Sequence, residues 1–263
     1  MRYLIDHDLH IHSMLSSCSS DPAQSTEAIL AYAKENGLKR LCLTDHFWDE
    51  EVEGASAWYA PQNFSHISRA LPLPQDPQVR FAFGCETEMN KQGTIGVSQE
   101  RIAAFDFIIV PTTHMHMKGY TIDESCVDAK GRAELWIKRF EILLDAPLPF
   151  EKGGIAHLTC GLMQNNSNTT SYEILDAIDR DRMHACFERA ARQGLKIELN
   201  MGLGDTRSES ALAIYRMAKE CRCKFYLGSD AHHPSELKGA MKRFDAMIDA
   251  LNLTEDDKAV IPF

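Results

Sequence analysis

The sequence predicts an α/β protein in which parallel strands close into a barrel. Apolar β-rich runs alternate with helix-period runs along the chain, and such alternation indicates parallel pairing with right-handed crossovers. The strand-like runs are apolar throughout, as in strands that are covered by helices on one side and closed on the other. With 263 residues and 44% hydrophobic content, the chain can bury one large core, so we expect a single domain over residues 1–263.

The first unit is a strand, a helix and a second strand. YLIDH predicts the first strand, TEAILAYAKENG the helix and LKRLCLTDH the second strand. Ser25 or Thr26 can cap the helix, Glu27 suits its first turn, and Gly37 stands where a left-handed residue ends a helix. This unit predicts a crossover between parallel strands.

The rest of the chain repeats this alternation. Further strands are expected at VRFAFGCE, FDFIIVPTTH, GGIAHL, LKIELN and KFYLGSDAH, and helices at AELWIKRFEILL, YEILDAIDRDRMHACFERAARQG, SESALAIYRMAKEC and ELKGAMKRFDAMIDAL. Residues 47–77 and 115–130 lack clear periodicity and follow strand-end histidines. We therefore expect long loops there, over the open end of the barrel.

Composition excludes several classes of partner. A formal net charge of -10 argues against a nucleic acid or an anionic membrane as the main partner, because either would meet a like-charged surface. No run is long and apolar enough to span a bilayer, and MRYLIDHD lacks the features of a signal peptide. We expect a cytoplasmic protein. Its eight cysteines are scattered without a CxxC pair, which favours reduced thiols.

Nearly every predicted strand ends in histidines, carboxylates or an amide: His10, His12, Asp45, His46, Glu86, Glu88, His114, His116, His157, Glu198, Asn200, Asp230, His232 and His233. The strand C-termini of a parallel barrel surround one mouth, so these side chains should converge. Imidazole and carboxylate bind Zn, Mn or Fe, and there are too many for one ion. We expect two or three divalent metal ions at the mouth, whereas His66 and His184, in helical segments, are expected to be structural.

The motifs HDLHIH, LTDH, GCE, TTH, IAH and GSDAH, in that order, resemble those of the polymerase and histidinol phosphatase (PHP) superfamily. This resemblance implies a distorted seven-stranded (β/α) barrel of the TIM-like kind. It also implies two or three divalent metals and, for a stand-alone enzyme, phosphoesterase activity.

The resemblance also implies a ligand set. One metal would be bound by His10, His12, Glu86 and Asp230, with Glu86 bridging to a second metal at His114 and His157, and a third metal would take His46 and His232. THMH lets either His114 or His116 face the mouth, and the match to TTH favours His114.

The third metal shows a departure from the family. There the loop after HxH commonly supplies a His or Asp ligand, and the matching place in SMLSSCSSD lies near Cys18. Three alternatives stay open: Cys18 binds as a thiolate, which would favour zinc; Asp21 reaches in; or the third site is weak.

Metal chemistry predicts the reaction. Two cations bridged by a carboxylate lower the pKa of a shared water enough to supply hydroxide near neutral pH, while a further cation binds phosphate oxygens. We expect this bridging hydroxide to hydrolyse a small-molecule phosphate monoester. Of the predicted ligands, four are also candidate catalytic residues: His10, His12, Glu86 and Asp230. Asp45 is a fifth candidate, and His7, Asp45 or an unligated His116 could assist the leaving alkoxide.

The substrate is less clearly indicated. Histidinol phosphate phosphatases tend to carry a basic residue just beyond the GIAHL-like strand, but HLTCGLMQNNSN has none before Arg180, which argues against histidinol phosphate. Arg207, in a loop after a strand, is the candidate phosphate clamp, and Asn200 is a second substrate contact. Thr206 and Glu209 resemble a capping box, which would make Arg207 a helix-start charge instead.

Two other functions compete with a phosphatase. An amidohydrolase-type barrel also opens with HxH, but it usually needs a modified lysine where this chain has Glu86, and LTDH and GSDAH do not match its pattern. A non-catalytic, metal-stabilised module would be expected to lack several ligands, and most of the set is present here.

Overall fold

The computed structural model describes residues 1–19, 21–200, 202 and 204–263. Its strands are β1 (His7–Ile11), β2 (Arg40–Leu43), β3 (His46–Phe47), β4 (Arg80–Phe83), β5 (Cys85–Thr87), β6 (Ile108–Pro111), β7 (Gly153–Ala156), β8 (Lys196–Leu199) and β9 (Phe225–Leu227). The α-helices are α1 (Thr26–Glu35), α2 (Phe64–Ile67), α3 (Gln99–Ile102), α4 (Ala129–Asp145), α5 (Ser171–Asp176), α6 (Arg180–Gln193), α7 (Glu209–Glu220) and α8 (Pro234–Leu251). Short 3-10 turns are η1 (Ser68–Ala70), η2 (Phe150–Lys152), η3 (Gly161–Gln164), η4 (Asp205–Arg207) and η5 (Glu255–Asp257).

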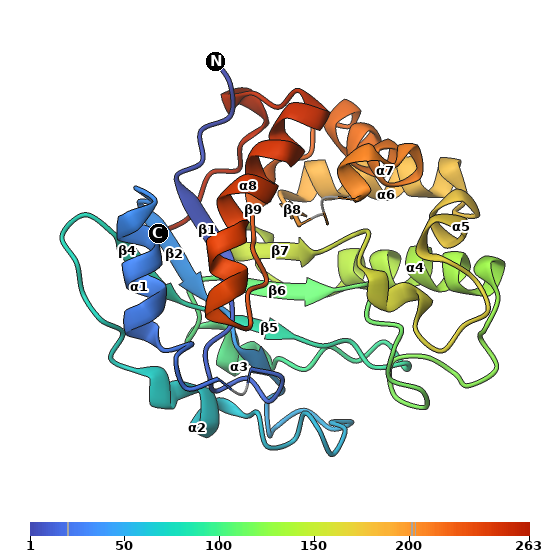
Figure 1. Cartoon of the computed structure of the whole chain (residues 1–263). Coiled ribbons are helices and arrows are strands. Elements are labelled where there is room, and N and C mark those ends of the chain that lie inside the picture. Colours follow the sequence, from blue (N-terminus) through green and yellow to red (C-terminus); the bar gives the residue numbers. More distant parts are fainter. Residues whose placement is uncertain (20, 201, 203) are drawn as a thin grey trace.

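The strands form two parallel sheets, in the orders β1-β2-β4 and β3-β5-β6-β7-β8-β9. The sheets continue into one another, because β3 follows β2 after two residues and β5 follows β4 after Gly84. At Gly84 a side chain would collide with the carbonyl oxygen of Phe107 and the sulfur of Cys42, so only glycine fits at this break. Figure 1 shows β5, β6 and β7 side by side with their arrowheads pointing the same way.

The ring closes between its first and last strands. The backbone N–H of Asp230 donates to the carbonyl of His10 at 2.7 Å, and that of His12 donates to the carbonyl of Ala231 at 3.0 Å. The described strands thus give a distorted parallel barrel with the order β1, β2/β3, β4/β5, β6, β7, β8, β9, which confirms the predicted fold class. Helices α4 to α8 lie around the strands (Figure 1).

The barrel core is apolar at one end only. Side chains from six strands form a small separate cluster: Leu9, Cys42, Ala82, Ile109, Ala156 and Tyr226, together with Phe107. A larger cluster lies between the strands and the helices, and it contains Trp136 and Phe140 of α4. No helix of the described residues is long and apolar enough to cross a membrane.

Several predicted elements differ from the structure. The strands expected at LKRLCLTDH and VRFAFGCE are each broken into two, as β2 and β3 and as β4 and β5. The first strand is HDLHI, not YLIDH; all five of its residues are buried although three are polar, so an apolar pattern placed it too early. The single helix expected from Tyr172 to Gly194 is two helices, because Asp179 caps a new one by accepting from the N–H groups of Asp181 and Arg182. By contrast, Ser25 caps α1 through the N–H of Ala28, as expected.

Candidate metal centre

Four side chains from three parts of the barrel converge at the mouth. Nε2 of His10 and Nε2 of His12 lie 3.1 Å apart. Oδ1 of Asp230 lies 3.3 Å from the first nitrogen and 3.2 Å from the second. Oε2 of Glu86 lies 3.5 and 3.4 Å from the same two nitrogens. These four atoms surround one point and could hold a metal ion.

Glu86 also faces a second group through its other oxygen. Oε1 lies 3.2 Å from Nε2 of His157 and 4.0 Å from Nε2 of His114. The two imidazole rings are stacked, with centroids 4.8 Å apart. Glu86, His114 and His157 form a second set that could hold a metal ion, and His114 rather than His116 belongs to it.

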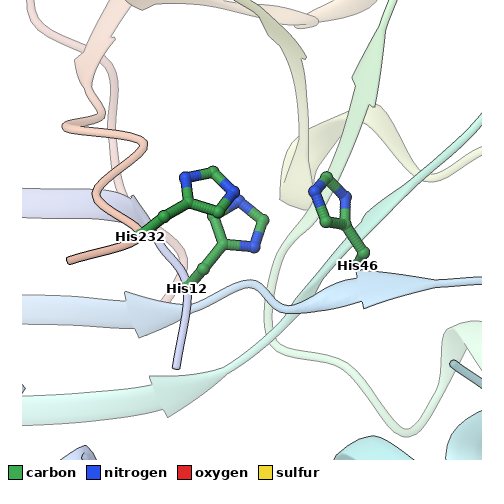
Figure 2. A group of neighbouring side chains, drawn as sticks. All are labelled: His12, His46 and His232. Atoms are coloured by element: carbon green, nitrogen blue, oxygen red, sulfur yellow. The ribbon is translucent and has the colours of Figure 1, made fainter. Parts of the chain in front are cut away.

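A third set combines His12, His46 and His232. The His12 and His232 rings are stacked, with centroids 4.0 Å apart, and the His46 ring lies 4.4 Å from that of His12. Figure 2 shows the three rings, with His46 facing the stacked pair across a gap. Nε2 of His12 also belongs to the first set, so an ion bound there would already use it. A third ion would then need another ligand besides His46 and His232.

The two candidates for that ligand lie in different surroundings. Cys18 lines the same cavity as His46 and His232. Oδ2 of Asp21 instead lies 2.8 Å from Nε2 of His233. Neither Cys18 nor Asp21 is in the metal-capable sets found among the described residues, so the cavity lining and the Asp21–His233 contact are what distinguish them. The geometry therefore favours Cys18 over Asp21.

The donor atoms fit divalent metals. At bond lengths of about 2.0–2.1 Å, tetrahedral ligands lie about 3.3 Å apart, close to the separations around His10 and His12. Nδ1 of His46 and Oε2 of Glu86 lie 2.9 Å apart, yet neither makes a hydrogen bond to another described residue. Buried polar atoms without a partner are costly, and metal ions bound in the neighbouring sets would satisfy both.

Hydrogen bonds fix the tautomers of the convergent imidazoles. Nδ1 of His10 donates to Glu198 Oε1 at 2.6 Å, and Nδ1 of His114 donates to Glu88 Oε2 at 2.8 Å. Nδ1 of His12 lies 2.9 Å from Ser16 Oγ. Because Nδ1 makes these hydrogen bonds, Nε2 is the nitrogen of each ring that faces the mouth and can bind a metal once it is deprotonated.

Two further imidazoles, those of His157 and His232, are held in the same way. Nδ1 of His157 lies 2.9 Å from Thr113 Oγ1, and Nδ1 of His232 lies 2.8 Å from the carbonyl oxygen of Asp230. The backbone is strained at two of these residues, because φ is 25° at His157 and 53° at Asp230. Non-glycine residues rarely adopt positive φ, and such strain is concentrated at functional sites.

Electrostatics prepare the cluster for cations. Burial raises the pKa of Glu86, but the charges of His10 and His46 outweigh it and hold that pKa well below its usual range. Burial lowers the pKa of His12, but the carboxylates of Asp230 and Glu86 raise it to about 9. The side chains by themselves thus pair ionised carboxylates with protonated imidazoles, and a metal would displace those protons.

His232 and His116 behave differently from His12. Burial and the charge of His12 lower the pKa of His232 to about 3, and burial and the charge of His114 lower that of His116 to about 4. Both rings are therefore neutral near pH 7, which leaves His232 ready to bind a metal.

A cavity of about 460 Å³ lies over the three sets. Its lining comprises Cys18, His46, Trp58, Tyr59, Glu86, His114, His116, Met117, Leu162, Asp230 and His232. Neither predicted substrate contact, Arg207 nor Asn200, is in this lining. Arg207 is exposed in η4. Asn200 directly follows β8 and is half-buried, and its Nδ2 has no partner among the described residues.

Some strand-end residues lie behind the cluster. Oδ1 of Asp45 accepts from Ser13 N and Ser16 Oγ, and Oδ2 accepts from Ser13 Oγ. His7 links β1 to β9, because its Nε2 accepts from the N–H of Leu227 at 3.0 Å. Of the three predicted helpers of the leaving group, His116 alone lines the cavity.

Sequence reasoning also missed several residues. Ser16 and Thr113 hold imidazoles, and Trp58, Met117 and Leu162 wall the cavity. Four of these residues lie outside the strands, in segments without a periodic hydrophobic pattern: Ser16, Trp58, Met117 and Leu162. The one signal that could have indicated them is their closeness in sequence to the HxH, DH, TTH and IAH motifs. His66 and His184 are in none of the metal-capable sets among the described residues: Nε2 of His66 donates to the carbonyl of Leu15, and His184 is half-exposed.

Comparison with one solved structure shows a shared fold, and two others are less similar. Histidinol phosphate phosphatase from Lactococcus lactis subsp. lactis Il1403, solved with zinc, L-histidinol and phosphate, matches with a TM-score of 0.65 and 15% identity, over 96% of this chain and 95% of that one. N-isopropylammelide isopropylaminohydrolase from Burkholderia multivorans ATCC 17616 gives a TM-score of 0.46 at 11% identity, over 97% and 70% of the two chains. An archaeal ribonuclease P structure with mature tRNA gives 0.39 at 12% identity, over 96% and 97%.

No curated protein sequence matches this chain. The family model of the PHP domain, however, matches residues 8–255. This range contains each side chain of the three metal-capable sets. The chain therefore belongs to the PHP domain family.

Proposed function

We propose that this protein is a metal-dependent phosphoesterase that hydrolyses a small-molecule phosphate monoester, carried by one domain over residues 1–263. The observation that carries this proposal is the position of Glu86. Its Oε2 faces His10 and His12, and its Oε1 faces His157. A carboxylate shared by two groups of imidazoles is the arrangement of a two-metal hydrolytic site.

The residues have distinct roles in this proposal. His10, His12, Glu86 and Asp230 would hold one divalent ion (Zn, Mn or Fe), and Glu86, His114 and His157 a second; His46 and His232, with Cys18, would hold a third. Bound there, such ions lower the pKa of water and offset the charge of a phosphoryl group. Glu198 and Glu88 orient the imidazoles that they contact.

The remaining residues bear on the substrate. His116 lines the cavity beside His114, where it can hydrogen-bond the leaving group. Asp45 supports the reaction indirectly, through Ser16 and His12. Asn200 and Arg207, which lie outside the cavity lining, are proposed contacts of the phosphoryl group and not of the alcohol. Arg207→Ala would raise KM and leave kcat nearly unchanged, since a binding contact made equally in ground and transition states affects KM alone.

The test combines metal analysis with a substrate comparison. Protein purified without chelator should contain at least two divalent metals per chain by elemental analysis. It should hydrolyse a generic aryl phosphate in the presence of Mn or Zn and leave a panel of amides intact. One metal or none would contradict the two-metal site, turnover of amides alone would indicate an amidohydrolase, and metal without any turnover would indicate a non-catalytic module.

A further inference from the structure

The walls of the cavity are uncharged. Of the described residues that line it, none is lysine or arginine, and the only carboxylates are Glu86 and Asp230, which belong to the metal-capable sets. Trp58, Met117 and Leu162 supply apolar surface. Once metals neutralise the carboxylates, the space beyond them offers no partner for a further charge.

Trp58 forms a firmly held aromatic wall next to the metal centre. Its ring centroid lies 5.1 Å from that of His46, at an interplanar angle of 69°. It also packs edge-on against Tyr59, with centroids 4.7 Å apart. Tyr59 is itself anchored, because its hydroxyl donates to Glu88 Oε2 at 3.2 Å. The indole thus packs against a tyrosine that is anchored by the same carboxylate that orients His114.

The segments that carry Met117 and Leu162 are joined by a buried guanidinium. Arg132 of α4 is fully buried. It donates to the carbonyl oxygens of Met115, Met163 and Asn165. These acceptors adjoin Met117 on one side and Leu162 on the other, so one side chain holds both segments. A wall fixed in this way lowers the entropy cost of binding a ligand.

We propose, on the basis of the phosphoesterase function above, that this cavity selects monophosphate esters of uncharged, apolar alcohols, aromatic ones foremost. Trp58, Met117 and Leu162 determine this specificity by contact with the leaving group. His116 also lines the cavity and adds an imidazole to its surface.

Charge decides against other phosphate esters. An ammonium group on the alcohol would lose its hydration shell on entering the cavity, and no carboxylate would be available there to form an ion pair with it. Burial of an unpaired charge is strongly unfavourable. A carboxylate or a second phosphate on the alcohol would likewise lack a lysine or arginine. An aromatic ring, in contrast, gains contact with the Trp58 indole and displaces water from apolar surface.

A matched substrate series tests this inference on the metal-loaded enzyme. The probes are benzyl phosphate, 4-(aminomethyl)benzyl phosphate and 4-carboxybenzyl phosphate, whose leaving alcohols differ mainly in charge. We expect kcat/KM for benzyl phosphate to exceed that for either charged ester by at least about tenfold. Trp58→Ala should raise KM for benzyl phosphate about tenfold and reduce the preference, while Trp58→Phe should retain most of it.

Controls separate this inference from the function on which it rests. Leu4→Ala removes an exposed aliphatic side chain away from the cavity and should change neither KM nor the preference. If Trp58→Ala does not fold, Leu162→Ala tests the same wall. Equal turnover of the three esters, or a preference for a charged one, would overturn the inference and leave the phosphoesterase intact. No turnover of any ester would overturn the proposed function, and this inference with it.

Discussion

The carboxylate of Glu198 joins His10 to His157. Its Oε1 accepts from Nδ1 of His10 at 2.6 Å, and its Oε2 accepts from the backbone N–H of His157 at 2.7 Å. These two histidines belong to different metal-capable sets. One buried side chain of β8 therefore positions residues of both sets.

Replacing Glu198 should weaken metal binding without removing a ligand. In Glu198→Gln the amide can still contact His10, but it lacks the negative charge that makes the imidazole a stronger donor. We expect metal affinity to fall about 10–100-fold, measured by zinc transfer to a chelator of known affinity. Glu209→Gln, on an exposed glutamate paired with Arg216, is the matched control, and equal zinc loss from both variants would contradict this role of Glu198.

Loss of the shared carboxylate should be more severe than loss of one imidazole. Glu86→Gln should lose most of its metal and its activity together, because two cations depend on the same charge. His114→Ala should lose one metal and retain the set around His10. Elemental analysis of both variants checks this, with His184→Ala as the neutral control; phosphatase activity retained in Glu86→Gln would exclude the bridging role.

Cys18 and Asp21 can be separated by paired substitutions. If the Cys18 thiolate completes the site of His46 and His232, Cys18→Ser should weaken one metal selectively and reduce phosphate affinity. Cys18→Asp or Cys18→His should restore both, with Asp shifting the preference from zinc towards manganese or iron. Asp21→Ala should have no such effect, and metal loss there with a silent Cys18→Ser would reverse the assignment.

Gly228 should tolerate no side chain. A Cβ there would overlap Oε1 of Glu198 and lie 2.7 Å from Cβ of His10. Gly228→Ala should therefore lower the free energy of unfolding by about 1–3 kcal/mol, measured by urea denaturation of the metal-free protein. At Gly161 a Cβ would meet nothing within 4 Å, so Gly161→Ala should be much less disruptive; similar losses in the two variants would show that crowding is not the cause.

Stability should rise at alkaline pH through Lys196. Burial lowers the pKa of its ammonium from 10.5 to about 8, where its Nζ donates to the carbonyl oxygens of Phe150 and Glu151. Between these two values the unfolded chain binds more protons than the folded one, so this side chain stabilises the fold increasingly as the pH rises from 8 towards 10.5.

Lys196→Met isolates that effect from other groups that titrate at alkaline pH. The free energy of unfolding of the natural chain minus that of the variant should increase from pH 8 to pH 10, measured by urea denaturation. A difference that stays constant or decreases over this range would contradict a lowered pKa for Lys196.

Local patterns in the sequence were enough to predict the fold class and the pool of candidate ligands. Hydrophobic periodicity is a short-range property of the chain, so it predicts the individual strands and helices from sequence. Their alternation along the chain then predicts the barrel. His10 and His12 stand two residues apart and so lie on one face of a strand, and both Nε2 atoms face the mouth. Ser25 likewise caps α1 through a neighbour only three residues away.

The motif resemblance already assigned Glu86 to two groups of imidazoles, but only the tertiary structure showed which carboxylates hold the imidazoles from behind. Glu86, Glu88 and Glu198 each stand near the end of a predicted strand. In the structure Glu86 belongs to the metal-capable sets, while Glu88 and Glu198 accept hydrogen bonds from Nδ1 of His114 and His10. The pairing of Glu198 with His10 spans 188 positions and depends on the closure of β9 against β1. Strand order and register set such contacts, and no local pattern encodes them.

The same holds for Asp45, Asp21 and the walls of the cavity. Asp45 contacts Ser13 and Ser16, and Asp21 contacts His233; the packing of the loops sets both groups of contacts. The cavity wall requires Arg132 to hold two segments that are distant in sequence. The sequence thus determined the fold class and the kinds of side chain at the mouth, while long-range packing determined the role of each.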